Sequence, residues 1–178
     1  MSNPNPEQKT QGKKRLSASR IFLIAFIVVA IGWLISRLAF PGNYTILSGT
    51  TPQNLGVESG QLAPCPSSPN CVNSQSDDPT HSIAPLQVQG SGEETLDQLK
   101  QIIENQERTN IVAATDTYLY AEFISRWMGY VDDVEFWWND DENQIEVRSA
   151  SRLGESDLGV NRERIETLRE QLTARTSS

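Results

Sequence analysis

The stretch "VDDVEFWWNDDENQIEVRS", residues 131–149, decides the fold of this chain. Val134, Phe136 and Trp138 alternate with other side chains, and residues 144–149 repeat the alternation. A period of two is typical of a strand that buries one face. The intervening "NDDEN" is rich in turn-forming residues. These residues therefore predict two antiparallel strands joined by a tight turn.

The neighbouring segments extend this hairpin into a small domain. Residues 118–125, "YLYAEFIS", show the same alternation, follow the strand-like "NIVAATD", and complete a meander. Apolar residues at helical spacing predict a helix over residues 93–106, with Ser91 and Glu94 as a capping box. A second helix is expected from Asn161, which is a candidate N-cap. We therefore predict an α+β fold, an antiparallel sheet meander with two helices on one face.

An apolar run without charges, "IFLIAFIVVAIGWLI", covers residues 21–35. Continued to Phe40 as a helix, it reaches about 30 Å, the thickness of the hydrocarbon core of a bilayer. We expect a single N-terminal transmembrane helix here, a signal anchor at residues 21–40 whose partner is the lipid bilayer. A cleaved secretory signal is the alternative, although no A-x-A-like cleavage site follows the run.

Charge is distributed unevenly along the chain. Residues 1–40 hold six of the fifteen basic residues and one of the twenty-three acids, and most of these basic residues precede the apolar run. The positive-inside rule then predicts a cytoplasmic N-terminus and a C-terminal domain on the exported side, periplasmic or lumenal. The rest of the chain is strongly acidic and should repel phosphate backbones, which argues against nucleic acid as a partner.

Composition divides the chain into four segments. We expect a basic disordered cytoplasmic arm at residues 1–20, the anchor at 21–40, a flexible linker at 41–60 and an exported globular domain at 61–175. The linker assignment depends on a high content of Gly, Thr, Ser and Pro with isolated apolar residues.

Both cysteines lie in "CPSSPNC", as Cys65 and Cys71. A zinc site of the Cys₂His₂ type is impossible within one chain because His81 is the only histidine. Five residues separate the cysteines, whereas a thioredoxin-like motif has two. In an oxidising exported compartment a structural disulfide is favoured, with a redox-responsive disulfide as the alternative. No metal and no cofactor are predicted.

The strand alternation gathers aromatic and ionisable side chains on the second face of the sheet. Its ligand-binding candidates are Glu122, Asp133, Glu135 and Arg148. In one interpretation these residues form cross-strand ion pairs, with Arg148 joined to Glu135 or Glu122. In the other, a proline-rich loop over residues 62–85 roofs a groove in which they orient a small ligand.

The segment "RSASRLGESDLGVNRER", residues 148–164, contributes further candidates. They are Ser149, Ser151, Arg152, Asp157, Asn161 and Arg162. A helix that begins near Asn161 would direct its positive end into this loop, which suits an anion. Internal pairing of the arginines with Asp132, Asp133 and Glu135 is the competing interpretation.

Four motifs together resemble a known family. "CPSSPNCVNSQ", "HSIAPL", "DDVEF" and "RSASRLGESDLGVNRERIETLR" are similar to those of the family called domain of unknown function 1499, over residues 63–172. The resemblance implies the same domain boundary and an exported location behind a signal or anchor. It also implies that the signature positions are Cys65, Cys71, His81, Asp132, Asp133, Glu135, Arg148, Ser149, Ser151, Arg152, Asp157, Asn161 and Arg162. It implies no particular reaction.

Two classes of function remain in competition. The leading hypothesis is a membrane-anchored envelope protein that acts as a binding or accessory module for a small ligand or a membrane-protein partner. The alternative is a hydrolase-type enzyme in which His81 acts with acidic residues of the sheet face. Against an enzyme, the chain lacks a G-x-S-x-G elbow, and a lone histidine in a loop is more often structural.

Overall fold

The computed structural model describes residues 17–176, so residues 1–16 of the predicted basic arm lie outside the described part of the chain. The chain divides into two units, residues 1–38 and residues 39–178. The first unit holds one long helix, α1 (Ala18–Ala39), of 22 residues. This helix is long and apolar enough to cross a membrane.

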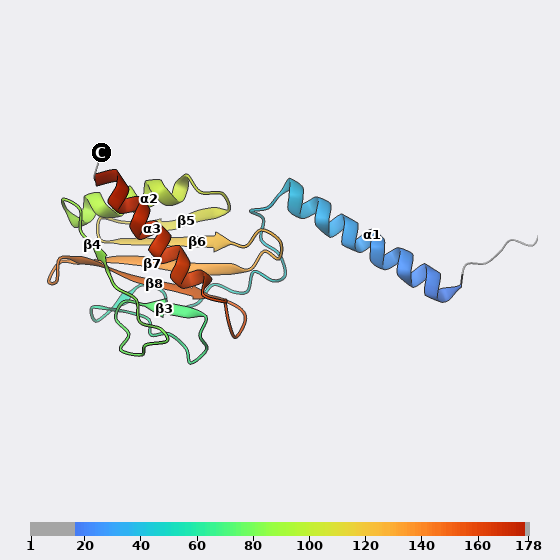
Figure 1. The fold of residues 1–178 in the computed structure, drawn as a ribbon, viewed down its shortest axis with the longest axis horizontal. Helices are drawn as coiled ribbons and strands as arrows, with labels where there is room; N and C mark the ends of the chain where they lie inside the picture. Colours follow the sequence, from blue (N-terminus) through green and yellow to red (C-terminus); the bar gives the residue numbers. More distant parts are fainter. Residues whose placement is uncertain (1–16, 177–178) are drawn as a thin grey trace, which may run out of the picture. The chain divides into compact units, whose positions relative to one another are not determined.

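The second unit is built on a six-stranded antiparallel sheet, which confirms the predicted α+β class (Figure 1). Its main path runs β3 (Cys71–Asn73), β8 (Gln144–Ser151), β7 (Val131–Asn139), β6 (Tyr118–Ile124) and β5 (Thr109–Ala114). A short strand, β4 (Leu86–Gln87), pairs with the start of β8. Strands β5 to β8 follow one another in sequence, which is the predicted meander.

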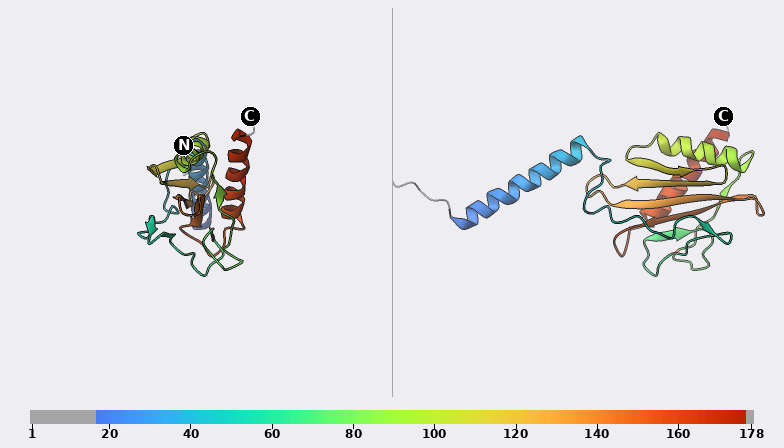
Figure 2. Two further views of the ribbon diagram at one scale, coloured as in Figure 1. Left: turned by 90° about the vertical axis from the view of Figure 1, so that its left-hand side faces the viewer. Right: turned by 180° about the vertical axis from the view of Figure 1, so that it is seen from behind.

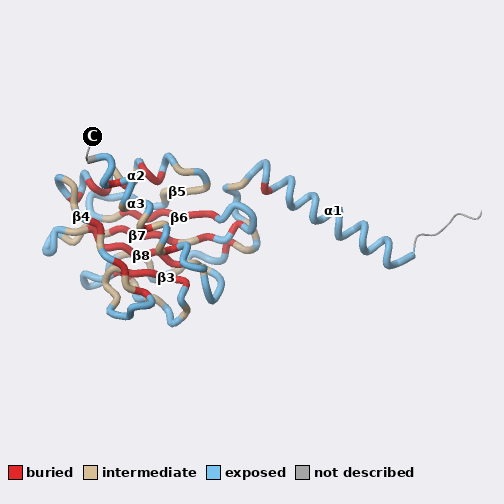
Figure 3. The backbone as a smooth tube through the Cα atoms, in the orientation of Figure 1, coloured by how far each residue is buried: buried red, intermediate tan, exposed pale blue. Residues whose placement is uncertain are grey.

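One hydrophobic core joins the sheet to helices α2 (Gly92–Glu104) and α3 (Val160–Thr176). From the strands it takes alternate residues, among them Leu119, Ala121, Val134 and Phe136. Both helices contribute leucines and isoleucines to the same cluster. The predicted capping box at the start of α2 is present, with reciprocal bonds between Ser91 and Glu94. Figure 3 shows how strongly burial concentrates in β6, β7 and β8.

The second face of the sheet is also buried. Every residue of β6 from Leu119 to Ile124 is buried, whereas the edge strand β5 alternates between half-buried and exposed positions. A sheet with one solvated face would show the β5 pattern in its central strands as well. Something must therefore cover the face opposite the helices.

The cover is residues 44–63, here called the crossing segment. It includes a two-stranded hairpin, β1 (Val57–Glu58) and β2 (Gln61–Leu62), which lies on the opposite side of the sheet from α3 (Figure 2, left). The composition of residues 41–60 predicts a flexible linker, but Tyr44, Thr45, Ser48 and Gly56 form hydrogen bonds with the sheet or its turns. These bonds use single side chains and one backbone amide, which leave no periodic signal in the sequence.

Two further details differ from expectation. Residues 71–73 lie inside the segment expected to be a loop, but they form strand β3, which pairs with β8. Alternation cannot be detected over only three residues, so the sequence gives no signal for this strand. Helix α3 begins at Val160, and the carboxylate of Asp157 accepts bonds from the amides of Gly159 and Asn161. The prediction of Asn161 as the N-cap is therefore wrong, and its side chain is used elsewhere.

Candidate functional site

The predicted ionisable face exists, and the crossing segment buries it. Strand register places Glu122 opposite Asp133 and Glu135 opposite Arg148, so the four side chains share one face. All four are buried, with 0% of Glu135 and 5% of Arg148 exposed. Charged groups leave water at a large cost unless partners satisfy them, so their contacts determine what this face can do.

Arg152 organises one half of this face. Its Nε donates to both carboxylate oxygens of Asp133, at 3.2 and 3.0 Å, and its Nη2 pairs with Glu122. The Tyr120 hydroxyl donates to Asp133 Oδ1 at 2.6 Å, and the Tyr44 hydroxyl donates to Glu122. The two carboxylates therefore have a shared cation and phenolic donors. Internal pairing, one of the two interpretations of the arginine-rich loop, describes Arg152.

Glu135 and Arg148 form the other half. Glu135 Oε1 accepts from the Tyr118 hydroxyl at 2.7 Å and from the backbone amide of Gly56 at 2.6 Å. Its Oε2 accepts from Arg148 Nη1 across 3.3 Å, which is longer than the usual 2.7–2.9 Å of a charge-assisted bond. The cross-strand pair between Arg148 and Glu135 is thus present, but the hydrogen bond that joins the two side chains is long.

The protonation equilibria of these groups follow from their contacts. Burial raises the pKa of Glu122, but the bonds from Tyr44 and Arg152 outweigh burial and leave that pKa below its ordinary value. Burial lowers the pKa of Arg152, and its bonds to Asp133 and Glu122 more than reverse this effect. Burial and the neighbouring carboxylates raise the pKa of Tyr118 and of Tyr120. The phenols are therefore neutral and donate to the carboxylates.

A pocket of about 430 Å³ opens beside Arg148. Thr50, Pro52 and Asn54 of the crossing segment and residues 64–66 form its walls. Its floor is formed by Asp133, Arg148, Ala150, Ser151 and Arg152. Among residues 17–176, the Arg148 Nε is buried without a hydrogen-bond partner. Asp133 and Arg152 satisfy each other. Of the buried side-chain nitrogen and oxygen atoms of this floor, the one without a partner is therefore Arg148 Nε.

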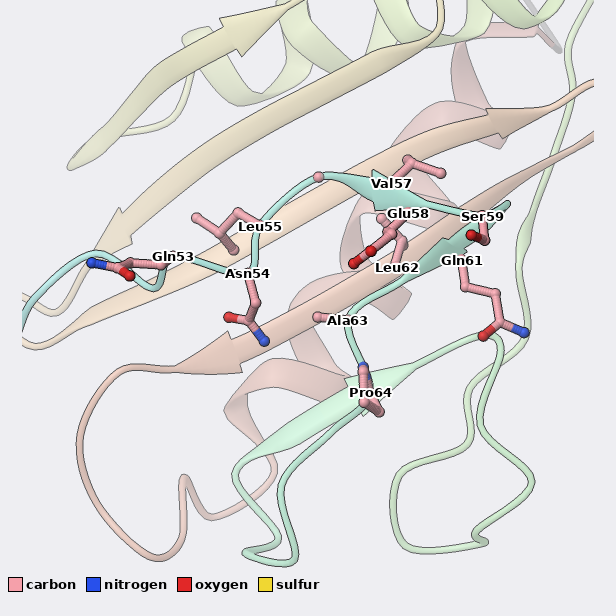
Figure 4. A pocket seen from close by; sticks show the side chains of 11 residues that line it. Gln53, Asn54, Leu55, Val57, Glu58, Ser59, Gln61, Leu62, Ala63 and Pro64 are labelled. Atoms are coloured by element: carbon pink, nitrogen blue, oxygen red, sulfur yellow. The ribbon is translucent and has the colours of Figure 1, made fainter.

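A second pocket, of about 420 Å³, lies within the crossing segment itself (Figure 4). Residues 53–64 line it, and Glu58 is the one ionisable side chain among these residues. Its other linings are amides, a hydroxyl, small aliphatic side chains and backbone. None of the side chains that line this pocket has a buried nitrogen or oxygen atom without a partner, so the Arg148 pocket is the stronger candidate.

The predicted residues Ser149, Ser151 and Asn161 meet on the other side of the sheet. The Asn161 side chain is fully buried, accepts from Ser149 Oγ at 2.5 Å and donates to Ser151 Oγ at 3.0 Å and to the Asn70 carbonyl at 2.9 Å. Arg164 donates to Asn161 and pairs with Asp132 at 2.5 Å. This cluster joins the start of α3 to the sheet and is satisfied internally.

The remaining loop candidates hold the chain in place. Asp157 caps α3, and Arg162 donates to the carbonyl of Thr80 at 3.2 Å. These two residues do not line the Arg148 pocket. The structure thus divides the sequence-predicted site residues between the covered face, the Asn161 cluster and the rim of α3, with Ser151 of the Asn161 cluster also lining the Arg148 pocket.

Cys65 and Cys71 form a disulfide, with their Cα atoms 5.7 Å apart. The carbonyl of Cys71 lies 2.9 Å from His81 Nδ1, so this ring nitrogen carries the proton and donates. His81 is buried, and its backbone carbonyl accepts from the amide of Asn73. Across residues 17–176, the hydrogen bonds of His81 link it to the backbone of this loop and not to the carboxylates of the sheet face.

Within residues 17–176 no three His, Cys, Asp or Glu side chains are grouped as a metal site would require. Asp133 and Glu122 are instead directed at the guanidinium of Arg152.

Several participants in the covered face are missing from the sequence-predicted site residues. Two of them, Tyr118 and Tyr120, donate to Glu135 and Asp133 from β6. Tyr44 and Gly56 come from the expected linker, and Glu146 is buried and accepts from Ser74 Oγ at 2.5 Å. Strand alternation places Glu146 on this face, so the sequence does carry a signal for it. Tyr44 and Gly56 lie far in sequence from their partners, so no local pattern points to them.

Fold and site together define an α+β domain that buries an ionic network under its own N-terminal segment and closes a loop with a disulfide. A protein-family model described as "Protein of unknown function (DUF1499)" matches residues 61–172. The chain belongs to this family, as its four motifs predict. A comparison with curated proteins finds no significant match.

Proposed function

We propose that this protein is a membrane-anchored binding module whose ligand site is the pocket beside Arg148. The observation that carries the proposal is the buried Arg148 guanidinium, which has one long bond to Glu135 and an Nε without a partner among the described residues. A buried donor left unsatisfied costs about 1–3 kcal/mol, and more on a charged group. A ligand that accepts from this donor would recover that free energy.

The chemistry of the pocket selects the class of ligand. The carboxylates of the covered face already have donors. The group without a partner is the Nε–H of Arg148, which needs an acceptor such as a carboxylate or a carbonyl. Asp133 lies in the same floor, and Glu135 is adjacent through its pair with Arg148. This local negative charge disfavours a multiply charged anion such as phosphate. A small ligand with one carboxylate or amide carbonyl fits best.

The anchor supplies the location in this proposal. Helix α1 is retained as a signal anchor, the N-terminus stays in the cytoplasm, and the domain works on the exported side of the membrane. Three observations support this assignment: the length and apolarity of α1, the basic residues that precede it and the Cys65–Cys71 disulfide. A tethered binding module there would present its ligand to, or take it from, a neighbouring membrane protein.

Isothermal titration of the full chain in detergent micelles tests the proposal. Acetate and N-acetylglycine should bind, whereas ethanol, a neutral analogue of similar size, and inorganic phosphate should not. The double variant Arg148→Met/Glu135→Gln removes the donor and its counter-charge together, which leaves no unpaired charge at this position. It should abolish binding, while Arg162→Met, which removes an arginine outside the pocket, should leave binding unchanged.

Two results would overturn the proposal. One is the absence of heat with every carboxylate and amide probe. The other is undiminished binding by the double variant, because the ligand would then occupy another part of the domain.

A further inference from the structure

Exposed apolar side chains gather at one end of the sheet. Six of them, here called the apolar rim, are Ile46, Trp127, Met128, Leu153, Leu158 and Val160. Ile46 is 92% exposed and Leu158 is 95% exposed. Single exposed apolar residues are normal on soluble domains, but a contiguous group marks an interaction surface.

The rim is contiguous because three segments are tied together there. Thr45 Oγ1 donates to the carbonyl of Met128 at 3.0 Å, and Ser48 Oγ donates to that of Gly129 at 2.9 Å. These bonds attach the start of the crossing segment to the β6–β7 turn. Leu153, from the loop before α3, and Val160, the first residue of α3, share a hollow of about 410 Å³ with Leu47 and Tyr130.

The rim combines side chains that suit a lipid interface. Trp127 is half-exposed, and the guanidinium of Arg126 lies 5.3 Å from the centre of its ring. Tryptophan, tyrosine and arginine are the residues that bridge hydrocarbon and headgroups in membrane proteins. The loop before α3 adds Glu155 and Asp157, so the rim is not basic. Binding to it would therefore depend on apolar insertion and not on anionic lipid.

The short stretch of chain between α1 and the sheet keeps this rim close to any membrane that α1 crosses. Helix α1 ends at Ala39, and Tyr44 is fixed to the sheet by its bond to Glu122. Five residues of extended chain reach at most about 18 Å. The headgroup region on each side of a bilayer is about 5–8 Å thick, so a span that ends at Ala39 holds the rim within reach of lipid.

We propose that the apolar rim docks on the bilayer that α1 crosses, with Ile46, Trp127 and Leu158 inserted at the level of the headgroups. The rim is a second membrane contact of the chain, separate from the span and from the Arg148 pocket. It holds the domain against the membrane in one orientation. Its occupant is lipid of any headgroup charge.

A site-specific fluorescent probe tests this docking in the full chain. Because both native cysteines are in the disulfide, Leu158→Cys can be labelled alone with nitrobenzoxadiazole under non-reducing conditions. Asp141→Cys, in the exposed β7–β8 turn at the other end of the sheet, is the matched control. Each protein is placed as one copy per nanodisc in phosphatidylcholine, with and without lipids that carry a spin label just below the headgroup.

Docking predicts a blue-shifted probe at position 158 that loses at least about half of its emission to the spin-labelled lipid, with little loss at position 141. High salt should not change the result. Equal emission with and without the spin label at position 158 would overturn lipid docking. Shielding that develops only when two copies share a nanodisc, or only after a membrane-protein partner is added, would also overturn it and would identify that occupant instead.

Discussion

Replacement of Arg152 by methionine should destabilise the domain more than any other single change on the covered face. The side chain of Arg152 is 4% exposed, and its pairs with Glu122 and Asp133 leave those carboxylates 7% and 1% exposed. Arg152→Met keeps the length and apolar stem of the side chain but leaves two buried carboxylates without their cation. Removal of one partner from a buried pair costs about 3–5 kcal/mol.

The expected loss can be measured by thermal unfolding in micelles, followed by near-ultraviolet circular dichroism. For a unit of this size each kcal/mol corresponds to about 3–4 °C, so Arg152→Met should lower Tm by roughly 10–15 °C. The neutral triple variant Arg152→Met/Asp133→Asn/Glu122→Gln should recover most of that loss, because no unpaired charge remains. Lys100→Met, which removes an exposed helix pair with Glu104, should cost about 0.5 kcal/mol or less.

Two results would refute this reasoning. If Arg152→Met lowers Tm by no more than Lys100→Met, water reaches the carboxylates and the crossing segment does not cover them. If the triple variant is no more stable than Arg152→Met, the loss comes from packing and not from unpaired charge.

Three further predictions concern the disulfide, an acid and an amide. Cys65→Ser/Cys71→Ser should cost about 2–2.5 kcal/mol through the added freedom of the unfolded loop, and an unchanged Tm would contradict this. The pKa of Glu122 is lower in the folded than in the unfolded state, so its contribution is complete above its ordinary pKa of about 4.3 and is lost as pH falls below that value. Tm of the wild type should therefore fall more steeply between pH 5 and 3 than Tm of Glu122→Gln, and parallel curves would argue against a depressed pKa. Asn161→Ala removes a fully buried side-chain amide whose oxygen and nitrogen both have partners, and it should lower the free energy of unfolding by about 3 kcal/mol in chemical denaturation. Arg162→Ala, at the next position, should cost under about 1 kcal/mol. Similar losses for the two variants would show that the amide cluster does not fasten α3.

Strand alternation predicts the sheet well because it reports a physical constraint. Successive side chains of a strand face opposite sides, so the sequence alone assigns Phe136 and Glu135 to different faces. The same alternation brings Glu135 and Arg148 together, and the structure pairs them. The capping box at Ser91 is predictable for a similar reason, since both of its bonds lie within one turn of helix.

The burial of the second face has no such signal in the sequence. That burial depends on residues 44–63, whose contacts with the sheet and its turns include a tyrosine hydroxyl, two small hydroxyls and the amide of Gly56. None of these has a period or a motif, and the backbone amide is common to nearly all residues. Asn161 illustrates the same limit, because an asparagine at the start of a helix has the same local sequence whether its side chain caps the helix or points into the sheet.

The most direct measurement of the proposed ligand site is the Nε–H resonance of Arg148 in a ¹H–¹⁵N correlation spectrum. The proposal predicts that acetate shifts this resonance in a saturable manner and leaves the corresponding signal of Arg162 unchanged, since Arg148 has the buried donor without a partner among residues 17–176. A signal of Arg148 that stays fixed at every acetate and N-acetylglycine concentration would contradict the assignment of this pocket as the binding site.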